Sequence, residues 1–177
     1  MADATKTYVA IVRGEGILKE RSLKDEGWFE LERPVKNENG NYNNATTSFR
    51  FLAGQGNEMG TLPRARASLV LCRPKTGRWH QIRQHLAGRS LSHPILGDTT
   101  HGDNTENSLW KEKRNMPGER TCLHLARIDL PPTKVCPSGL TVSCPLAPDM
   151  LQMLKDHLPG LVEEAGPVLR EEGLYLW

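Results

Sequence analysis

Residues 74–86 read Pro-Lys-Thr-Gly-Arg-Trp-His-Gln-Ile-Arg-Gln-His-Leu, the most informative stretch of this 177-residue chain. A helix is predicted over residues 78–87, preceded by a capping Thr and followed by Gly88. At 100° per residue, Trp79, Ile82 and Leu86 share one helix face, so we expect that face to meet the core. The stretch therefore joins a strand to an amphipathic helix.

Arg83 lies about 40° from Trp79 on this helical wheel, at the border of the apolar face. A guanidinium in that place is partly removed from water and needs a carboxylate or phosphate partner. Leaving it unpaired would cost on the order of 3–5 kcal/mol. The sequence therefore predicts a specific anionic partner for Arg83.

Strand and helix patterns extend outward from this stretch. Alternating or β-rich segments predict strands at residues 6–14, 46–53, 67–72, 122–130 and 140–146, and residues 28–35 contain a short apolar cluster. A second helix is predicted at Asp149–Leu158, ended by Pro159-Gly160, and loops are predicted at residues 37–44, 54–63 and 92–107. Because strands and helices do not alternate regularly, we expect an α+β fold around a mixed, largely antiparallel sheet. One domain over residues 1–158 and a weakly ordered tail over 159–177 are expected.

Positive charge is concentrated around residues 74–86, although the net charge is only +2. From Met59 to Gly97 there is no Asp or Glu, while seven cations fall there: Arg64, Arg66, Arg73, Lys75, Arg78, Arg83 and Arg89. Such a stretch indicates a surface that faces a polyanion. Charges paired across the fold would give the same composition, and the charge pattern alone does not separate the two interpretations.

The bulk composition, with 37% hydrophobic and 25% charged residues, is that of an ordinary soluble globular protein. The sequence contains no apolar run of eighteen residues and no visible targeting signal, so we expect a soluble intracellular protein of unassigned compartment, without a membrane partner.

Residues 93–103, His-Pro-Ile-Leu-Gly-Asp-Thr-Thr-His-Gly-Asp, form a second dense segment. Its spacing matches neither a zinc-protease motif nor a calcium loop. A structural loop is the favoured interpretation, with Asp98 and Asp103 accepting hydrogen bonds from backbone N–H groups beside His93, Gly97 and His101. A metal-dependent hydrolase built on these residues is the least favoured alternative.

Together, the two segments resemble the signature of the RluA family of RNA pseudouridine synthases, and the Gly-Asp-x-x-His-Gly-Asp-Asn ending is similar to its TruC-like subgroup. Three further landmarks occur in the family's order: Lys6–Gly14, Ala45–Phe49 and Leu123–Ala126. The resemblance implies a pseudouridine synthase fold and a reaction on RNA, with tRNA favoured, that needs no cofactor or metal.

The resemblance also implies roles for individual residues. Tyr8 would stack on the flipped uridine and assist proton removal, and Arg83 would pair with the catalytic aspartate and hold it ionised. The RNA backbone would be contacted by basic residues, namely Arg73, Lys75, Arg78, His80 and Arg89.

The family's nucleophile motif, His-Arg-Leu-Asp, is not found in this chain; Arg127-Ile128-Asp129 falls in a late strand where the family has none. We therefore expect a C-terminal part of the catalytic domain, inactive alone, whose missing N-terminal half is supplied by a full-length gene product. On this interpretation Arg83 has no carboxylate partner in its own chain. A non-catalytic RNA-binding module derived from the family is the main alternative.

Overall fold

The computed structural model describes residues 4–55, 66–116 and 118–175. Within them, a six-stranded antiparallel sheet has the order β10-β9-β1-β8-β7-β4. Its strands are β1 (Thr5–Arg13), β4 (Phe29–Glu32), β7 (Thr46–Gln55), β8 (Ala67–Pro74), β9 (Leu123–Leu130) and β10 (Leu140–Ser143). Two short pairs lie outside it: β2 (Ile17–Leu18) with β3 (Arg21–Ser22), and β5 (Val35–Lys36) with β6 (Tyr42–Asn43). The expected α+β fold with a largely antiparallel sheet is confirmed.

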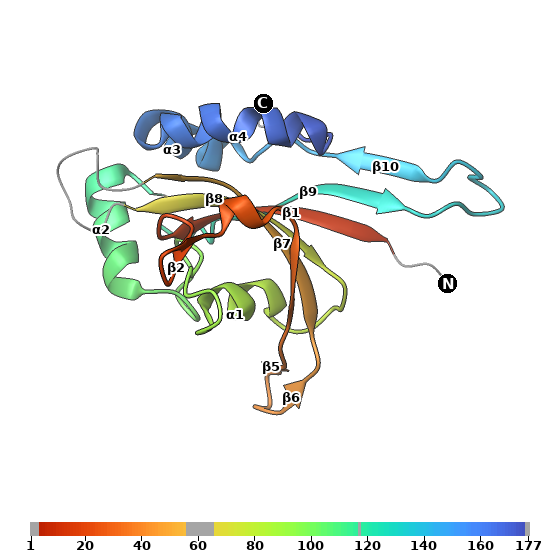
Figure 1. The fold of residues 1–177 in the computed structure, drawn as a ribbon, viewed down its shortest axis with the longest axis horizontal. Helices are drawn as coiled ribbons and strands as arrows, with labels where there is room; N and C mark the ends of the chain where they lie inside the picture. Colours follow the sequence, from red (N-terminus) through yellow and green to blue (C-terminus); the bar gives the residue numbers. More distant parts are fainter. Residues whose placement is uncertain (1–3, 56–65, 117, 176–177) are drawn as a thin grey trace.

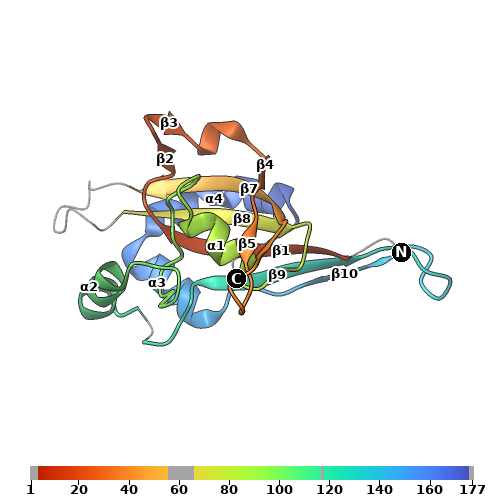
Figure 2. The same cartoon turned by 90° about the horizontal axis from the view of Figure 1, so that it is seen from below.

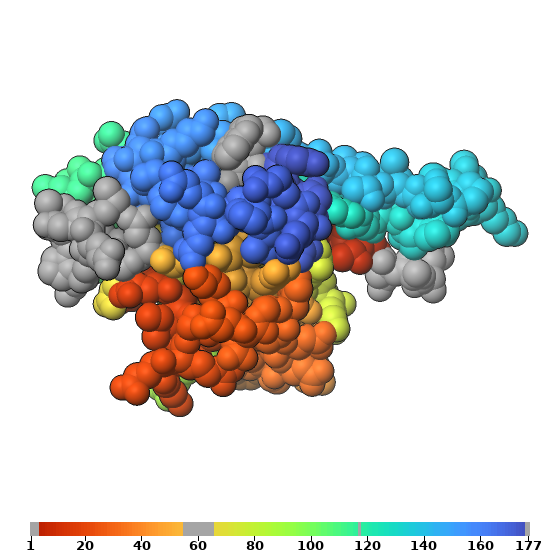
Figure 3. All heavy atoms as spheres, turned by 45° about the horizontal axis from the view of Figure 1, so that its top comes forward, coloured from red at the N-terminus to blue at the C-terminus, as the bar shows by residue number. Residues whose placement is uncertain are grey.

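Helices cover both faces of the sheet (Figure 1). The helices α3 (Pro148–His157) and α4 (Pro159–Glu171) lie on one face, and α1 (Gln81–Ala87) lies on the other. The helix α2 (Asn104–Arg114) stands at one end of the sheet, and the β9–β10 hairpin extends beyond the other (Figure 2). Figure 3 shows the two C-terminal helices lying over the sheet, with the N-terminal segments below them.

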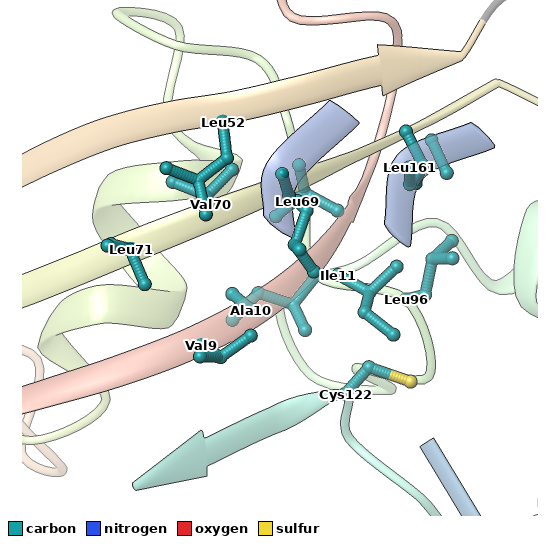
Figure 4. Close-up of a cluster of buried hydrophobic side chains, with 14 of the residues drawn as sticks. Val9, Ala10, Ile11, Leu52, Leu69, Val70, Leu71, Leu96, Cys122 and Leu161 are labelled. Carbon is teal, nitrogen blue, oxygen red and sulfur yellow. The ribbon is translucent and has the colours of Figure 1, made fainter. Parts of the chain in front are cut away.

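The core forms where the central strands meet these helices. Val9 to Val12 of β1 and Leu69 to Cys72 of β8 are all at most 2% exposed. Figure 4 shows Leu69 and Ile11 in one cluster with Leu161 of α4 and Leu96 of the loop after α1. Because both faces of β1 and β8 are covered, these strands read as continuous apolar runs rather than as alternating ones.

The α1 helix is shorter than predicted, because His80 adopts a left-handed conformation (φ 49°) directly before it. Thr76 does not cap the helix: its hydroxyl donates to the side-chain oxygen of Gln81 and accepts from the N–H of Thr46. Trp79 therefore lies in the turn before α1, and only Ile82 and Leu86 of the predicted trio occupy its buried face.

The predicted loop over residues 92–107 ends in a helix that the pattern missed. Asp103 is the N-cap of α2 and accepts from the N–H groups of Thr105 and Glu106. Asp98 accepts from the N–H groups of Thr100 and His101, so the predicted backbone capping by both aspartates is confirmed. The polar helix was missed because its apolar periodicity is weak.

The expectation of a weakly ordered tail is wrong over Pro159–Glu171, which forms α4. Proline is tolerated in the first turn of a helix, so Pro159 begins α4 instead of only ending α3. Leu161, Ala165 and Leu169, four residues apart, are buried in the main core. Glu172 then accepts hydrogen bonds from the side chains of Trp28, Arg50 and Arg73 and fixes the end of the helix to the sheet.

Two predicted loops remain to be placed. Gly54 belongs to β7, and residues 56–63 lie outside the described part of the chain. The predicted turn at residues 37–44 is partly confirmed: Asn37 accepts from the N–H groups of Asn39 and Asn41, but Tyr42–Asn43 pair with β5.

Replacing Leu169 by alanine should lower the free energy of unfolding by about 2–5 kcal/mol, because the side chain is 2% exposed and its removal leaves a cavity. Urea denaturation of the whole chain measures this change. The neighbouring exposed residue provides the control, since Arg170→Ala should change stability by less than about 0.5 kcal/mol. Equal small effects would mean that α4 does not pack as described.

No helix among the described residues is long and apolar enough to cross a membrane.

Candidate active site

A cavity of about 480 Å³ opens between the N-terminal end of β1, the end of β8 and the start of α1. Five of the residues predicted to act in catalysis or RNA binding line it together: Tyr8, Lys75, Arg78, His80 and Arg83. The described residues that line it include no Asp or Glu. Segments separated by about seventy residues therefore form one basic cavity.

Tyr8 reaches the cavity from β1. Successive strand residues point to opposite faces, so Tyr8 faces α1 while its neighbour Thr7 faces the side covered by α4. Partial burial raises the pKa of the Tyr8 phenol. The phenol is therefore neutral near pH 7 and presents both an aromatic face and a hydroxyl to the cavity.

Arg83 has a carboxylate partner in its own chain, so the prediction of an unpaired arginine is wrong. Its Nε donates to Oδ2 of Asp98 at 2.8 Å, and its Nη2 donates to Oδ1 at 2.7 Å. The Asp98 side chain is 1% exposed. The need for an anionic partner was inferred correctly, but the second sequence segment supplies that partner.

Burial opposes ionisation of Asp98, but the hydrogen bonds from Arg83 and from the N–H groups of His101 and Thr100 outweigh it and lower its pKa. Asp98 is therefore a carboxylate that orients Arg83. The Arg83 guanidinium has five N–H donors. Among the described residues, three of these donors are used: Nε and Nη2 donate to Asp98, and Nη1 donates to His80. The remaining two can serve an anion in the cavity.

His80 and His101 continue this network. Arg83 Nη1 lies 2.7 Å from Nε2 of His80, and Nδ1 of His80 lies 3.0 Å from Nε2 of His101. Trp79 stacks on the His80 ring with 3.8 Å between ring centroids. Burial lowers the pKa of both histidines, and the neighbouring charge of Arg83 lowers it further. Of these two histidines, only His80 is among the described residues that line the cavity.

The two cations at the rim differ from Arg83 because they are exposed. Lys75 pairs with Glu30, and Arg78 donates from Nε to the carbonyl of Asn44. The exposed ion pair of Lys75 with Glu30 contributes little to stability, and both cations can exchange these contacts for an anion. Their position suits contacts with a phosphate backbone.

Arg73 and Arg89 do not join the cavity. Arg73 donates to Thr7 and Glu172 on the α4 face and lies 4.3 Å from the ring centroid of Trp28. Arg89 is exposed just after α1. Their predicted contacts with RNA stay predictions, and for Arg73 such a contact would lie on the opposite face of the sheet from Tyr8.

Gln81 was not singled out from the sequence, yet it holds the wall of the cavity together. Its side-chain nitrogen donates to the Thr46 carbonyl and the Thr47 hydroxyl, and its oxygen accepts from Thr76 and from the N–H of Arg78. The sequence did offer a signal for this role. Gln81 is a polar residue at the start of a helix, where the backbone groups of the preceding turn need hydrogen-bond partners.

Of the other loop residues, His93 lies past the far end of β1, and Gly97 sets the turn directly before Asp98. His93 accepts from the N–H of Gly16 through Nε2, and its Nδ1 lies 2.5 Å from the Leu91 carbonyl. Gly97 has φ 78°, and a Cβ there would lie 1.7 Å from the Arg120 carbonyl oxygen. Only glycine fits this position, which places Asp98 beneath Arg83.

Comparisons with known proteins agree with this fold. The sequence profile of the RNA pseudouridylate synthase family matches residues 2–88. The tRNA pseudouridine synthase C of Vibrio vulnificus is 37% identical over 131 residues, covering 71% of this chain and 51% of that protein. Its counterpart in Vibrio cholerae is 38% identical over 128 residues, covering 70% and 50%. The chain thus spans about half the length of these relatives.

Two solved human structures share the fold. RNA Pseudouridylate Synthase Domain Containing 4 superimposes with a TM-score of 0.58 at 20% identity, covering 86% of this chain and 61% of that one. RNA Pseudouridylate Synthase Domain Containing 1 gives a TM-score of 0.56 at 24% identity, covering 90% and 64%. By its motifs, its relatives and its antiparallel sheet, the chain belongs to the RluA family of RNA pseudouridine synthases.

Proposed function

We propose that this chain supplies the tyrosine and arginine part of a pseudouridine synthase active site that acts on tRNA. The observation that carries the proposal is the cavity itself, where Tyr8 and Arg83 meet under a rim of exposed cations. The described lining offers no carboxylate of its own, and Asp98 is buried beneath Arg83. Because the family's nucleophile motif is also not found in the sequence, the proposal assigns the nucleophilic aspartate to a segment outside these 177 residues and expects the chain alone to be inactive.

The proposed chemistry converts uridine to pseudouridine without a change in composition. The supplied aspartate attacks C1′ of the flipped nucleotide and displaces N1 of the base, which breaks the N1–C1′ bond. The base then rotates, C5 attacks C1′ and displaces the aspartate carboxylate, and N1 takes up a proton. The proton on C5 is finally released, with Tyr8 assisting its removal. The two N–H groups of Arg83 left over by Asp98 and His80 hold the incoming carboxylate ionised.

Flipping a base out of a folded RNA costs a few kcal/mol, which contacts to the distorted backbone offset. Lys75 and Arg78 at the rim are placed for those contacts. The choice of tRNA is supported by the curated relatives, whose printed name is tRNA pseudouridine synthase C.

Tritium release from tRNA containing 5-³H-uridine tests the function. The chain is measured alone and as a completed enzyme, expressed either with the coding sequence upstream of it or with the part of the Vibrio vulnificus relative that it does not match. We expect no release from the chain alone and release from the completed enzyme.

Two results would contradict the proposal. Turnover by the chain alone would show that its nucleophile lies within the chain. No release from a folded completed enzyme that binds tRNA would leave a non-catalytic RNA-binding module as the better description.

Replacing Lys75 by alanine should weaken tRNA binding and reduce the slope of log K against log salt by about one, because one phosphate contact is lost. Filter binding of the completed enzyme at several salt concentrations measures both. Lys19→Ala is the control, since Lys19 is an exposed lysine in the turn between β2 and β3, past the other end of β1. An unchanged slope for Lys75→Ala would place the phosphate path elsewhere.

A further inference from the structure

Four side chains form an unbroken hydrogen-bonded series behind the cavity. Asp98 binds Arg83 through two bonds, Arg83 Nη1 reaches Nε2 of His80 at 2.7 Å, and Nδ1 of His80 reaches Nε2 of His101 at 3.0 Å. Arg83 and His80 line the cavity, whereas His101 is not among its described lining residues. The side-chain hydrogen bond of His101 therefore reaches the cavity lining through His80.

The donors and acceptors in this series allow one arrangement of protons. A guanidinium only donates, so Nε2 of His80 must carry a lone pair. Neutral His80 then has its proton on Nδ1, which points at Nε2 of His101. That nitrogen must accept, so His101 is also neutral and protonated on Nδ1.

Packing holds both rings in place for this arrangement. Trp79 stacks on His80 at an interplanar angle of 21° and meets His101 edge-on at 5.8 Å between centroids. The two imidazole rings stand nearly perpendicular, at 87°. The left-handed backbone conformation of His80 (φ 49°) sets the direction in which its side chain leaves the turn before α1. Tilting either ring out of its plane would disturb an aromatic contact with Trp79.

We propose that His101 is a positioning residue: acting through His80, it holds the guanidinium of Arg83 in one orientation, and only while both imidazoles are neutral. A proton added to Nε2 of His80 would face an N–H of Arg83. A proton added to Nε2 of His101 would face the N–H of His80. Either proton would set two donors against each other and break the series, so that the guanidinium would lose its contact at Nη1 and be held by Asp98 alone.

The charged groups around the two rings set the direction of the pH dependence. Burial is the largest effect and lowers the pKa of both histidines. Around His80, Arg83 and His101 lower the pKa further, while Asp98 and Glu38 raise it. Around His101, Asp98 raises the pKa and Arg83 lowers it. The neutral series is therefore intact at pH 7 and is lost on acidification below the ordinary histidine value of about 6.5.

The proton arrangement can be measured on the chain as it is. Long-range ¹H–¹⁵N spectra of histidine-labelled protein distinguish the two neutral forms of each ring. We expect the Nδ1–H form for both His80 and His101 at pH 7.5. The Nε2–H form at His80 would overturn the proposal, because that nitrogen could not accept from Arg83.

The link to turnover rests on the proposed function and is measured on the completed enzyme. His101→Phe keeps a ring but removes the acceptor, so kcat should fall about tenfold to a hundredfold with little change in KM, and His80 should lose its Nδ1–H form. His101→Gln keeps an acceptor oxygen and should restore kcat to within about threefold. Log kcat should fall on acidification with a limiting slope of two in the unchanged enzyme and one in His101→Gln.

Thr99→Ala, an exposed change in the same loop, should leave kcat and the His80 spectrum unchanged. A fall in kcat for His101→Phe with the His80 proton still on Nδ1, or no rescue by a folded His101→Gln, would overturn the positioning role. Absence of turnover in the unchanged completed enzyme would instead refute the proposed function, and the spectra would still decide the proton arrangement.

Discussion

Replacing Arg83 by alanine is expected to abolish pseudouridine formation and to lower the free energy of unfolding by about 3–5 kcal/mol. The stability loss follows because Asp98, 1% exposed, would keep its charge without the guanidinium that neutralises it. The loss of turnover follows because, among the described cations that line the cavity, only Arg83 is held in place by a buried carboxylate, that of Asp98. Tritium release from the completed enzyme and urea denaturation of the chain measure the two effects.

Measuring both tritium release and tRNA binding distinguishes the effect of changing Arg83 from the effect of changing Lys75 at the rim of the cavity. Arg83→Ala should leave tRNA binding within about twofold, whereas Lys75→Ala should mainly weaken binding. Arg83→Lys keeps the charge but loses the bidentate hydrogen bonds to Asp98. Its free energy of unfolding should therefore lie between those of the unchanged chain and of Arg83→Ala. If Arg83→Ala and Lys75→Ala have the same effects, the distinction between a buried arginine and an exposed lysine is wrong.

Tyr8→Phe is expected to lower kcat of the completed enzyme by about 10²- to 10⁴-fold, because the change removes the hydroxyl that we propose assists proton removal. The ring proposed to stack on the base remains, so tRNA binding should stay within about twofold. Single-turnover tritium release with saturating enzyme measures the chemical step without the contribution of binding.

Tyr42→Phe is the matched control for Tyr8→Phe. Tyr42 is 67% exposed on β6 and does not line the cavity, so the same loss of a hydroxyl should leave kcat unchanged. A Tyr8→Phe enzyme that turns over at the unchanged rate would remove Tyr8 from the reaction and reduce it to a packing residue of β1.

The central strands of the fold were predictable because their apolar runs are bounded by glycine and proline. The helices were less so, for local reasons. Pro159 can end one helix or begin the next, and the sequence pattern does not choose between them. The choice is made by Leu161 and Leu169, which are buried only because the sheet lies beneath them. Tertiary packing thus decided the tail.

The candidate site shows the same division. The motif around residues 74–86 predicted that Arg83 needs an anion, and the motif around residues 93–103 predicted an aspartate in a structural turn. Arg83 and Asp98 pair with each other through a tertiary contact between residues fifteen apart. Neither the helical nor the strand period of the sequence encodes such a contact. Arg73 was predicted to act with the other cations because it is close to them in the sequence. Cys72 pairs with Tyr8 across the sheet, so its neighbour Arg73 points to the opposite face from Tyr8. Strand alternation could therefore have excluded Arg73 from the cavity.

Photo-crosslinking of tRNA that carries 5-iodouridine at the modified position tests most directly whether the uridine lies between Tyr8 and Arg83. The completed enzyme is irradiated with this tRNA, and the linked residue is identified by mass spectrometry. We predict a crosslink at Tyr8, reduced by competing unmodified tRNA. Crosslinks confined to aromatic residues outside the cavity, such as Trp28 or Tyr42, would contradict the proposed site.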